Sequence, residues 1–83
     1  MAEQWWVYLV RCSDGTLYTG ITNDLERRIV EHNSKNGGAR YTRSRRPVKL
    51  VYSEQTESRS GAAKREYRIK RMPLAEKTKL IGS

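Results

Sequence analysis

The stretch 5–33, WWVYLVRCSDGTLYTGITNDLERRIVEHN, decides the fold. Residues 5–12 and 16–21 are rich in aromatic, β-branched and other apolar side chains, which is typical of strands. Residues 13–15, Ser-Asp-Gly, separate them, and Asp-Gly between two such runs is a strong hairpin signal. The stretch therefore predicts a β-hairpin, and the polar residues after it predict a helix.

The register of this hairpin decides whether its two tyrosines meet, because side chains alternate between faces along a strand. A two-residue loop, Asp14-Gly15, would place Tyr8 and Tyr18 on opposite faces of the sheet. A three-residue loop with the glycine in the left-handed conformation pairs Tyr8 with Gly20 and puts both phenols on one face. We favour the second register. Because Gly20 has no side chain, we expect a gap beside the Tyr8 phenol that a ligand backbone can approach.

Capping signals, prolines and periodicity predict the other elements. Asn23 is expected to cap the first helix, with Glu26 three residues later completing a capping box. The later segments are predicted as a long loop over 33–46 with room for a helical turn, an edge strand over 48–54 after Pro47, a polar connector over 56–60, a helix over 62–72 that Pro73 ends, and a last helix over 74–81. Because residues 5–10 are apolar on both faces, they are expected to form a central strand. The order strand, strand, helix, loop, strand, helix, helix predicts a single α+β domain over residues 1–83.

Composition favours a polyanionic partner. The 83 residues include 17 Lys and Arg against 9 Asp and Glu, which gives a net charge of +8. Such an excess favours association with nucleic acid, DNA most of all. No apolar run approaches the length of a membrane span, so we expect no membrane contact and a cytoplasmic location. Cys12 and His32 are the only cysteine and histidine, which excludes an internal disulfide and a zinc site of the usual Cys/His kind. Any metal must be held by oxygen.

Helical spacing gathers the remaining polar candidates. Arg28 and His32 are four residues apart and share a helix face, whereas Glu66 follows the spacing of Ala62 and Ile69 and is expected to face the core. A carboxylate that faces a core is costly unless it is paired or binds a cation. Together with the two hairpin tyrosines, these side chains are expected to line one shallow site on the sheet.

These residue types suit phosphodiester hydrolysis. A divalent cation on Glu66 would neutralise the scissile phosphate, and Arg28 offers a planar fork to the non-bridging oxygens. A phenol or an imidazole would take the proton of the attacking water. A tyrosine base would need its pKa lowered from about 10 by Arg28 or the metal.

Several motifs resemble the GIY-YIG nuclease domain over nearly the whole chain. They are Val7-Tyr8-Leu9, Tyr18-Thr19-Gly20, the helix around Arg28 and His32, and the helix that contains Glu66. The resemblance is strongest to small stand-alone bacterial members, of which Ala39-Arg40-Tyr41-Thr42 and Arg45-Arg46-Pro47-Val48 are also typical.

The resemblance implies a three-stranded antiparallel sheet flanked by helices and a single Mg²⁺ or Mn²⁺ site. It implies that Tyr8 and Tyr18 are the signature tyrosines and that Gly20 is the glycine that closes the second motif. Arg28 then matches the phosphate-binding arginine, and His32 a position that carries Tyr or His in active members. Glu66 matches the metal-binding glutamate. Tyr8, Tyr18 and His32 all stay candidates for the base.

The chain departs from the family pattern in three places. The first motif reads Val-Tyr-Leu in place of Gly-Ile-Tyr, and Ile21 stands where some members carry lysine. Many endonucleases of the family have an asparagine after the metal glutamate, but the chain has none beyond Asn36. These departures bear on turnover more than on the fold. We expect no attached DNA-targeting domain, so a partner protein that supplies targeting is considered, and the oligomeric state stays open.

The loop after the first helix is Gly-rich and basic. Its candidate nucleic-acid-binding residues are Arg40, Tyr41, Arg43, Arg45 and Arg46, with the arginines on phosphates and the tyrosine stacked on a base. A solvated loop is the plainer interpretation.

The other candidates have plainer interpretations as well. The tyrosines could fill a core that has no Phe, Arg28 could pair with Asp24 or Glu31, and Glu66 could pair with Lys70. The leading hypothesis is a metal-dependent endonuclease that acts on structured or damaged DNA in repair or recombination. The alternatives are a catalytically weak nucleic-acid-binding module that uses the loop 35–46 and, less favoured, a small RNA-associated protein.

Overall fold

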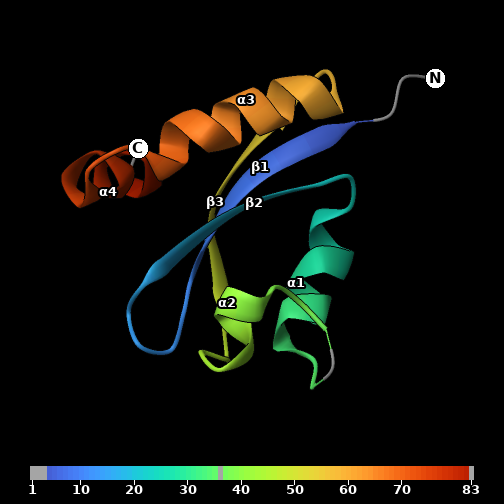
Figure 1. The fold of residues 1–83 in the computed structure, drawn as a ribbon, viewed down its shortest axis with the longest axis vertical. Helices are drawn as coiled ribbons and strands as arrows, with labels where there is room; N and C mark the ends of the chain where they lie inside the picture. Colours follow the sequence, from blue (N-terminus) through green and yellow to red (C-terminus); the bar gives the residue numbers. More distant parts are fainter. Residues whose placement is uncertain (1–3, 36, 83) are drawn as a thin grey trace.

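The computed structural model describes residues 4–35 and 37–82. The strands are β1 (Trp5–Arg11), β2 (Leu17–Thr22) and β3 (Lys49–Thr56), and the helices are α1 (Leu25–Asn33), α2 (Arg40–Arg43), α3 (Arg59–Lys70) and α4 (Leu74–Gly82). The predicted α+β class and element order are confirmed (Figure 1). Among the described residues, no helix has the length and apolar character that crossing a membrane requires.

The three strands form one antiparallel sheet with β1 in the centre, in the order β2-β1-β3. In the pairing of β1 with β2, Tyr8 lies opposite Gly20 and Val10 lies opposite Tyr18. Gly15 has a φ of 85°, the left-handed conformation that the three-residue loop requires. The predicted register is therefore confirmed, and the hairpin brings both tyrosines to the same face.

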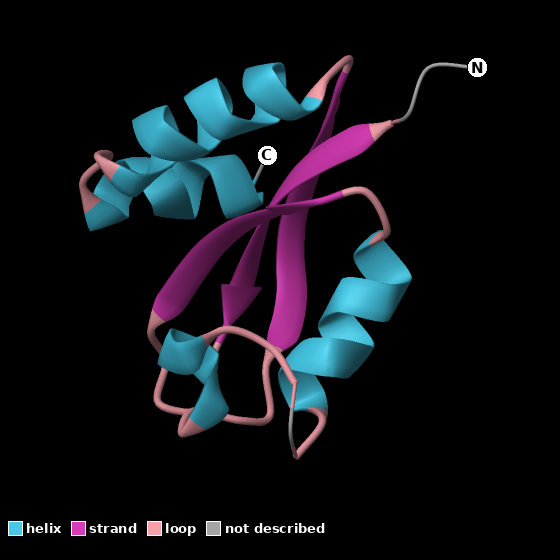
Figure 2. Ribbon diagram, turned by 45° about the vertical axis from the view of Figure 1, so that its right-hand side comes forward, coloured by secondary structure: helices cyan, strands magenta, loops and turns pink. Residues whose placement is uncertain are grey.

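Side chains of β1 alternate between two small cores, one on each face of the sheet. Val7 and Leu9 are buried against α3 with Ala62 and Ile69. Tyr8 and Val10 point the other way and form a second cluster, which also contains Cys12 and Val48 and is covered by Leu25 and Ile29 of α1. Figure 2 shows the sheet between α1 on one side and the α3–α4 pair on the other. The expectation of a central strand covered on both faces is confirmed.

The predicted cap of the first helix is wrong by one residue. Asp24 is the N-cap, and its carboxylate accepts a hydrogen bond of 3.1 Å from the Arg27 backbone N–H. With Asp24 as the cap, the third helical position is Arg27, so Glu26 does not complete a capping box. Asn23 and Asp24 are both good caps, and the helix begins after the second of them. Helix α3 also begins earlier than predicted, because Ser58 caps it and accepts from the Gly61 N–H at 3.0 Å.

Gly38 lies where the loop after α1 passes closest to His32. Its φ is 80°, and a Cβ built on it would lie 2.7 Å from the Cα of His32. We therefore expect Gly38→Ala to lower the free energy of unfolding by about 1–3 kcal/mol, because both the left-handed backbone and the backbone contact oppose a side chain. Thermal unfolding followed by circular dichroism measures this loss. Gly82→Ala is the matched control, because a Cβ there meets nothing within 4 Å, and an equal loss in both variants would contradict the prediction.

Candidate active site

Tyr8 lies flat against the glycine across from it. A Cβ on Gly20 would come within 2.5 Å of the Tyr8 hydroxyl oxygen and 3.1 Å of the Tyr18 ring. The space left by the missing side chain is therefore filled by the Tyr8 phenol itself. The expectation that a ligand backbone approaches at Gly20 is wrong, and this glycine serves to seat a buried phenol.

His32, from the last turn of α1, reaches back over the sheet to the two tyrosines. Its Nε2 is 2.7 Å from the Tyr8 hydroxyl, and its ring makes edge contacts with Tyr8 and Tyr18 at centroid distances of 5.8 and 5.5 Å. Both Tyr8 and His32 are buried, whereas Tyr18 is half-buried. The two rings share one face of the sheet as expected, but the site is less open to solvent than expected, and only Tyr18 of this group reaches the surface.

Burial sets the protonation of this pair. It lowers the pKa of His32 to about 4, and the positive charge of Arg28 acts in the same direction. Burial also raises the pKa of Tyr8 to about 12, although the hydrogen bond from Arg28 opposes that shift. At neutral pH the pair therefore consists of a neutral phenol and a neutral imidazole. The Tyr8 pKa moves away from neutrality, opposite to what a tyrosine base needs, so Tyr8 cannot act as a preformed phenolate.

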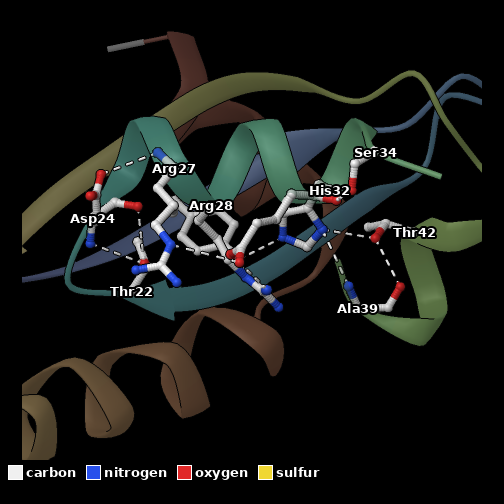
Figure 3. A network of polar contacts seen from close by, with 10 residues as sticks. Thr22, Asp24, Arg27, Arg28, His32, Ser34, Ala39 and Thr42 are labelled. Atoms are coloured by element: carbon white, nitrogen blue, oxygen red, sulfur yellow. Dashed lines mark hydrogen bonds and ion pairs between the residues drawn. The ribbon is translucent and has the colours of Figure 1, made fainter. Parts of the chain in front are cut away.

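Arg28 stands at the outer edge of the same cluster. Its Nε–H donates to the Tyr8 oxygen at 3.4 Å, which is a long bond, and its NH1 lies 3.4 Å from a Glu31 carboxylate oxygen. The side chain is 27% exposed, so part of the guanidinium faces solvent beside the buried phenol. Figure 3 shows Arg28 and His32 projecting from α1, with dashed lines for their hydrogen bonds. The guanidinium is thus placed to receive a phosphate next to the Tyr8 hydroxyl.

Glu66 lies on the side of α3 that packs toward the sheet, as its spacing from Ala62 and Ile69 predicts. Its side chain is 22% exposed, and its negative charge acts on Tyr8 and contributes to the raised pKa of that phenol. Its carboxylate also lies 3.5 Å from the Lys70 ammonium one turn later. The ion pair that the sequence offered as the plainer interpretation is therefore present, and a role for Glu66 at the tyrosine cluster stays a prediction.

Glu66 alone does not supply enough ligands to hold Mg²⁺ or Mn²⁺. Among the described residues, no group of three or more His, Cys, Asp or Glu side chains is arranged to hold a metal ion. Mg²⁺ is commonly bound by one or two carboxylates together with waters and substrate phosphates, so a single half-buried carboxylate is compatible with it. The residues fit a cation that the substrate helps to bind and do not fit a metal held by the protein alone.

A comparison with models of known protein families shows the family of this chain. A family model described as the GIY-YIG catalytic domain matches residues 4–79. The chain belongs to the GIY-YIG family. This is a nuclease family, and the roles of the arginine, the tyrosines and the carboxylate described above stay predictions.

Relatives of known sequence or structure agree with this GIY-YIG assignment. A UPF0213 protein of Desulfotalea psychrophila is 61% identical over 93% of this chain and 70% of its own length, and one of Staphylococcus saprophyticus is 49% identical over 96% of each chain. The solution structure of a UPF0213 protein from Bacillus halodurans is 39% identical, with a TM-score of 0.60 over 95% of this chain and 83% of that one. That of a protein from E. faecalis is 43% identical, with a TM-score of 0.57 over 84% and 74%. The chain is therefore similar to small GIY-YIG proteins of the UPF0213 type.

Tyr41, in the basic loop of this GIY-YIG domain, contacts both Tyr18 and Arg45 through its ring. One face stacks on Tyr18 at a centroid distance of 5.8 Å and an interplanar angle of 24°, and the Arg45 guanidinium lies 4.1 Å above the ring. Asp14 in the hairpin turn holds Arg45 in place, with 3.0 Å between the carboxylate and Nε. Tyr41 therefore supports Tyr18, but the residue is still 38% exposed, so stacking of Tyr41 on a base stays a prediction.

The arginines of the basic loop divide into two kinds. Arg45 and Arg46 bond within the protein, to the Tyr41 carbonyl at 2.8 Å and to the Ser34 carbonyl at 2.6 Å respectively. Arg40 and Arg43 are exposed, and Arg43 lines a polar pocket with Arg46 on the surface. Arg40 and Arg43 are thus the members of the loop best placed for phosphates, whereas Arg45 and Arg46 also hold the loop together. Phosphate binding by all four stays a prediction.

The structure adds a polar residue to the GIY-YIG site that the sequence did not single out. Thr42 in α2 is buried, and its hydroxyl lies 2.8 Å from Nδ1 of His32. The only signal in the sequence was indirect, because Thr42 lies in the Ala39–Thr42 motif that resembles small bacterial members of the family. A threonine among four arginines reads as part of a solvated loop, and only the path of the loop past Gly38 brings it to the imidazole.

Proposed function

We propose that this protein is a divalent-metal-dependent nuclease that hydrolyses phosphodiester bonds of DNA at structured or damaged sites. The observation that carries the proposal is the contact of one buried phenol oxygen, that of Tyr8, with both a histidine and an arginine. Nε2 of His32 lies 2.7 Å from that oxygen, and the Arg28 Nε–H lies 3.4 Å from it. A proton acceptor and a phosphate-binding group are thus held on neighbouring sides of one hydroxyl.

Each residue has a role that follows from its position. The exposed part of Arg28 binds the non-bridging oxygens of the scissile phosphate, and this draws the guanidinium away from its long bond to Tyr8. The freed phenol oxygen then takes a proton from the attacking water while its own proton passes to His32. In this proposal His32 acts through Tyr8, because its Nε2 lies 2.7 Å from the Tyr8 hydroxyl oxygen. Half-buried Tyr18 lines the surface on which the substrate lies.

In this proposal Glu66 and the substrate phosphate together bind the metal ion. When bound, Mg²⁺ or Mn²⁺ would supply charge neutralisation at the phosphate and the leaving oxygen. Glu66 would have to exchange its contact with the Lys70 ammonium for the cation, and Lys70 would then be free to turn toward the phosphate backbone. The net charge of +8 and the exposed Arg40 and Arg43 support a nucleic-acid substrate. DNA is chosen because the family match is to a nuclease domain whose members are expected to act on it.

One observation favours a second candidate, a nucleic-acid-binding module with little turnover. The Glu66 carboxylate already has a cationic partner in Lys70, at 3.5 Å. If that pair does not open for a metal, the basic surface binds nucleic acid and the tyrosine cluster serves only as a core.

Cleavage of a branched or flapped DNA separates the two candidates. We expect the wild-type protein to cut with Mg²⁺ or Mn²⁺ and to lose the activity in a chelator, because the carboxylate site is incomplete without a cation. Glu66→Gln is expected to lower the rate constant by about 10²-fold, since the amide is a neutral and weaker ligand. Glu57→Gln, at an exposed glutamate ahead of α3, should leave the rate unchanged. Binding of the DNA without cleavage in either metal would decide for the binding module.

A further inference from the structure

His32 is held between two hydroxyl groups, one on each ring nitrogen. Nε2 lies 2.7 Å from the Tyr8 oxygen, and Nδ1 lies 2.8 Å from the Thr42 oxygen. All three side chains are buried, so water does not compete for these bonds. Figure 3 shows Thr42 and Ala39 on the far side of the imidazole from Arg28. The imidazole therefore has a fixed partner at each nitrogen, and its tautomer is decided by which hydroxyl donates.

The hydrogen bonds around His32 determine which groups are donors. The Thr42 hydroxyl donates to the Ala39 carbonyl at 3.0 Å, so its oxygen accepts from the Nδ1–H of His32. Nε2 is then unprotonated and accepts the Tyr8 O–H, while the Tyr8 oxygen accepts from Arg28. In this arrangement every hydroxyl and ring hydrogen has an acceptor. With the proton on Nδ1 all the hydroxyl and ring hydrogens of the cluster are therefore satisfied, at the cost of the long 3.5 Å contact from the Ala39 N–H to Nδ1.

The other tautomer leaves a hydrogen without an acceptor. If Nε2 carried the proton, it would donate to Tyr8, whose oxygen would accept from His32 and Arg28 at once. Among the described contacts, the buried Tyr8 hydrogen would then have no acceptor, which costs about 1–3 kcal/mol. The Ala39 N–H, 3.5 Å from Nδ1, is the one backbone donor placed to favour that tautomer, and the Thr42 oxygen at 2.8 Å prevails over it.

We propose that Thr42 is a positioning residue that holds His32 as the Nδ1–H tautomer, so that Nε2 stays free to accept the proton of Tyr8. Its place in catalysis rests on the proposed nuclease function, whereas the tautomer itself does not. In the hydrolytic step the water oxygen bonds to phosphorus and the bond to the leaving oxygen breaks. The water proton goes to the Tyr8 oxygen, the Tyr8 proton goes to Nε2, and Nδ1–H keeps its bond to Thr42. Thr42 neither gains nor loses a proton.

The tautomer can be read without ambiguity because His32 is the only histidine in the chain. In ¹⁵N-labelled protein, the imidazole ¹⁵N shifts and the two-bond couplings to the ring hydrogens tell a protonated nitrogen from a free one. We expect wild-type protein at pH 7 to show a protonated Nδ1 and a free Nε2. Thr42→Val keeps the shape of the side chain but removes the acceptor, so the Ala39 N–H becomes the partner of Nδ1 and the proton should move to Nε2. Thr42→Ser restores the hydroxyl and should restore the wild-type pattern.

DNA cleavage by the same proteins supplies the second measurement. Thr42→Val is expected to lower kcat by about 10²-fold with KM nearly unchanged, because Nε2 can no longer take the Tyr8 proton, and Thr42→Ser should recover most of it. A wild-type spectrum with the proton on Nε2, or a Thr42→Val protein that keeps the Nδ1–H form, would overturn the inference. If Thr42→Val does not fold, the wild-type and Thr42→Ser spectra still decide. The expected spectra in a wild-type protein that does not cut DNA would uphold the role of Thr42 and refute the nuclease function.

Discussion

Arg28→Ala is expected to reduce DNA cleavage by about 10³-fold while the protein stays folded. Arg28 is the cation that contacts the Tyr8 hydroxyl, and its guanidinium is the planar group beside the place where a phosphate would sit. Removing such a donor from a developing charge commonly costs 10²–10³ in rate or more. The loss of stability should be small, because the Tyr8 contact is long and the pair with Glu31 is partly exposed. Single-turnover cleavage and thermal unfolding measure the two quantities.

The neighbouring arginine provides a control of the same chemistry. Arg27 also pairs with Glu31, at 3.8 Å, but its side chain is 76% exposed and makes no described contact with Tyr8. Arg27→Ala removes the same charge from the same helix and should change cleavage by no more than about twofold. Arg28→Lys tests the planar fork, since lysine keeps the charge without the two parallel donors. Equal losses in Arg27→Ala and Arg28→Ala would mean that net charge, and not a specific contact, supports activity.

We expect the free energy of unfolding to fall as the pH is lowered from 6.5 toward 4, because of His32. Its folded-state pKa of about 4 lies below the ordinary value of 6.5, so the unfolded chain binds the proton more readily between those limits. The stability that the neutral His32 contributes is fully present above pH 6.5 and is lost as the pH falls toward 4. Below pH 4 no further loss arises from His32. The difference corresponds to about 3 kcal/mol, a large share of the stability of a domain this small. Urea unfolding at a series of pH values measures the slope.

The origin of this slope can be isolated. His32 is the only histidine, and the pKa of Asp14 is lowered by its hydrogen bonds with Thr16, so we assign the slope between pH 6.5 and 5 to His32. Tyr8, Arg28 and Glu31 surround His32, and among them only the carboxylate of Glu31 favours the charged imidazole. His32→Gln should flatten the slope between pH 6.5 and 5, whatever its own effect on stability. An imidazole that titrates near 6.5 by NMR would contradict the prediction.

The hairpin could be predicted from residues that are close together in the sequence. The register depended on a three-residue loop and a glycine at its end, which are properties of neighbouring residues, and the structure has both. The helix start was less certain for the same reason, because Asn23 and Asp24 both have the chemistry of a cap. Spacing along a helix was also enough to place Glu66 on the inner side of α3.

Contacts between distant segments could not be predicted in the same way. The sequence does not show that Tyr41 stacks on Tyr18, because that stack joins residues 23 positions apart through a loop without periodicity. It does not show the bond from Thr42 to His32 either, since that bond depends on how the chain passes Gly38. Residue types alone suggested an open basic loop, whereas two of its four arginines, Arg45 and Arg46, are bonded at the surface to other groups of the protein.

Helix α2 has a single turn, yet it serves two surfaces. Thr42 faces inward to the imidazole, whereas Arg43, the next residue, faces outward to where nucleic acid would lie. A phosphate that pulls on one residue of so short a helix also displaces its neighbour. Under the proposed nuclease function, replacing Arg43 should therefore alter kcat as well as Kd, whereas Thr42→Val, which keeps the shape of the inward-facing side chain, should alter kcat alone.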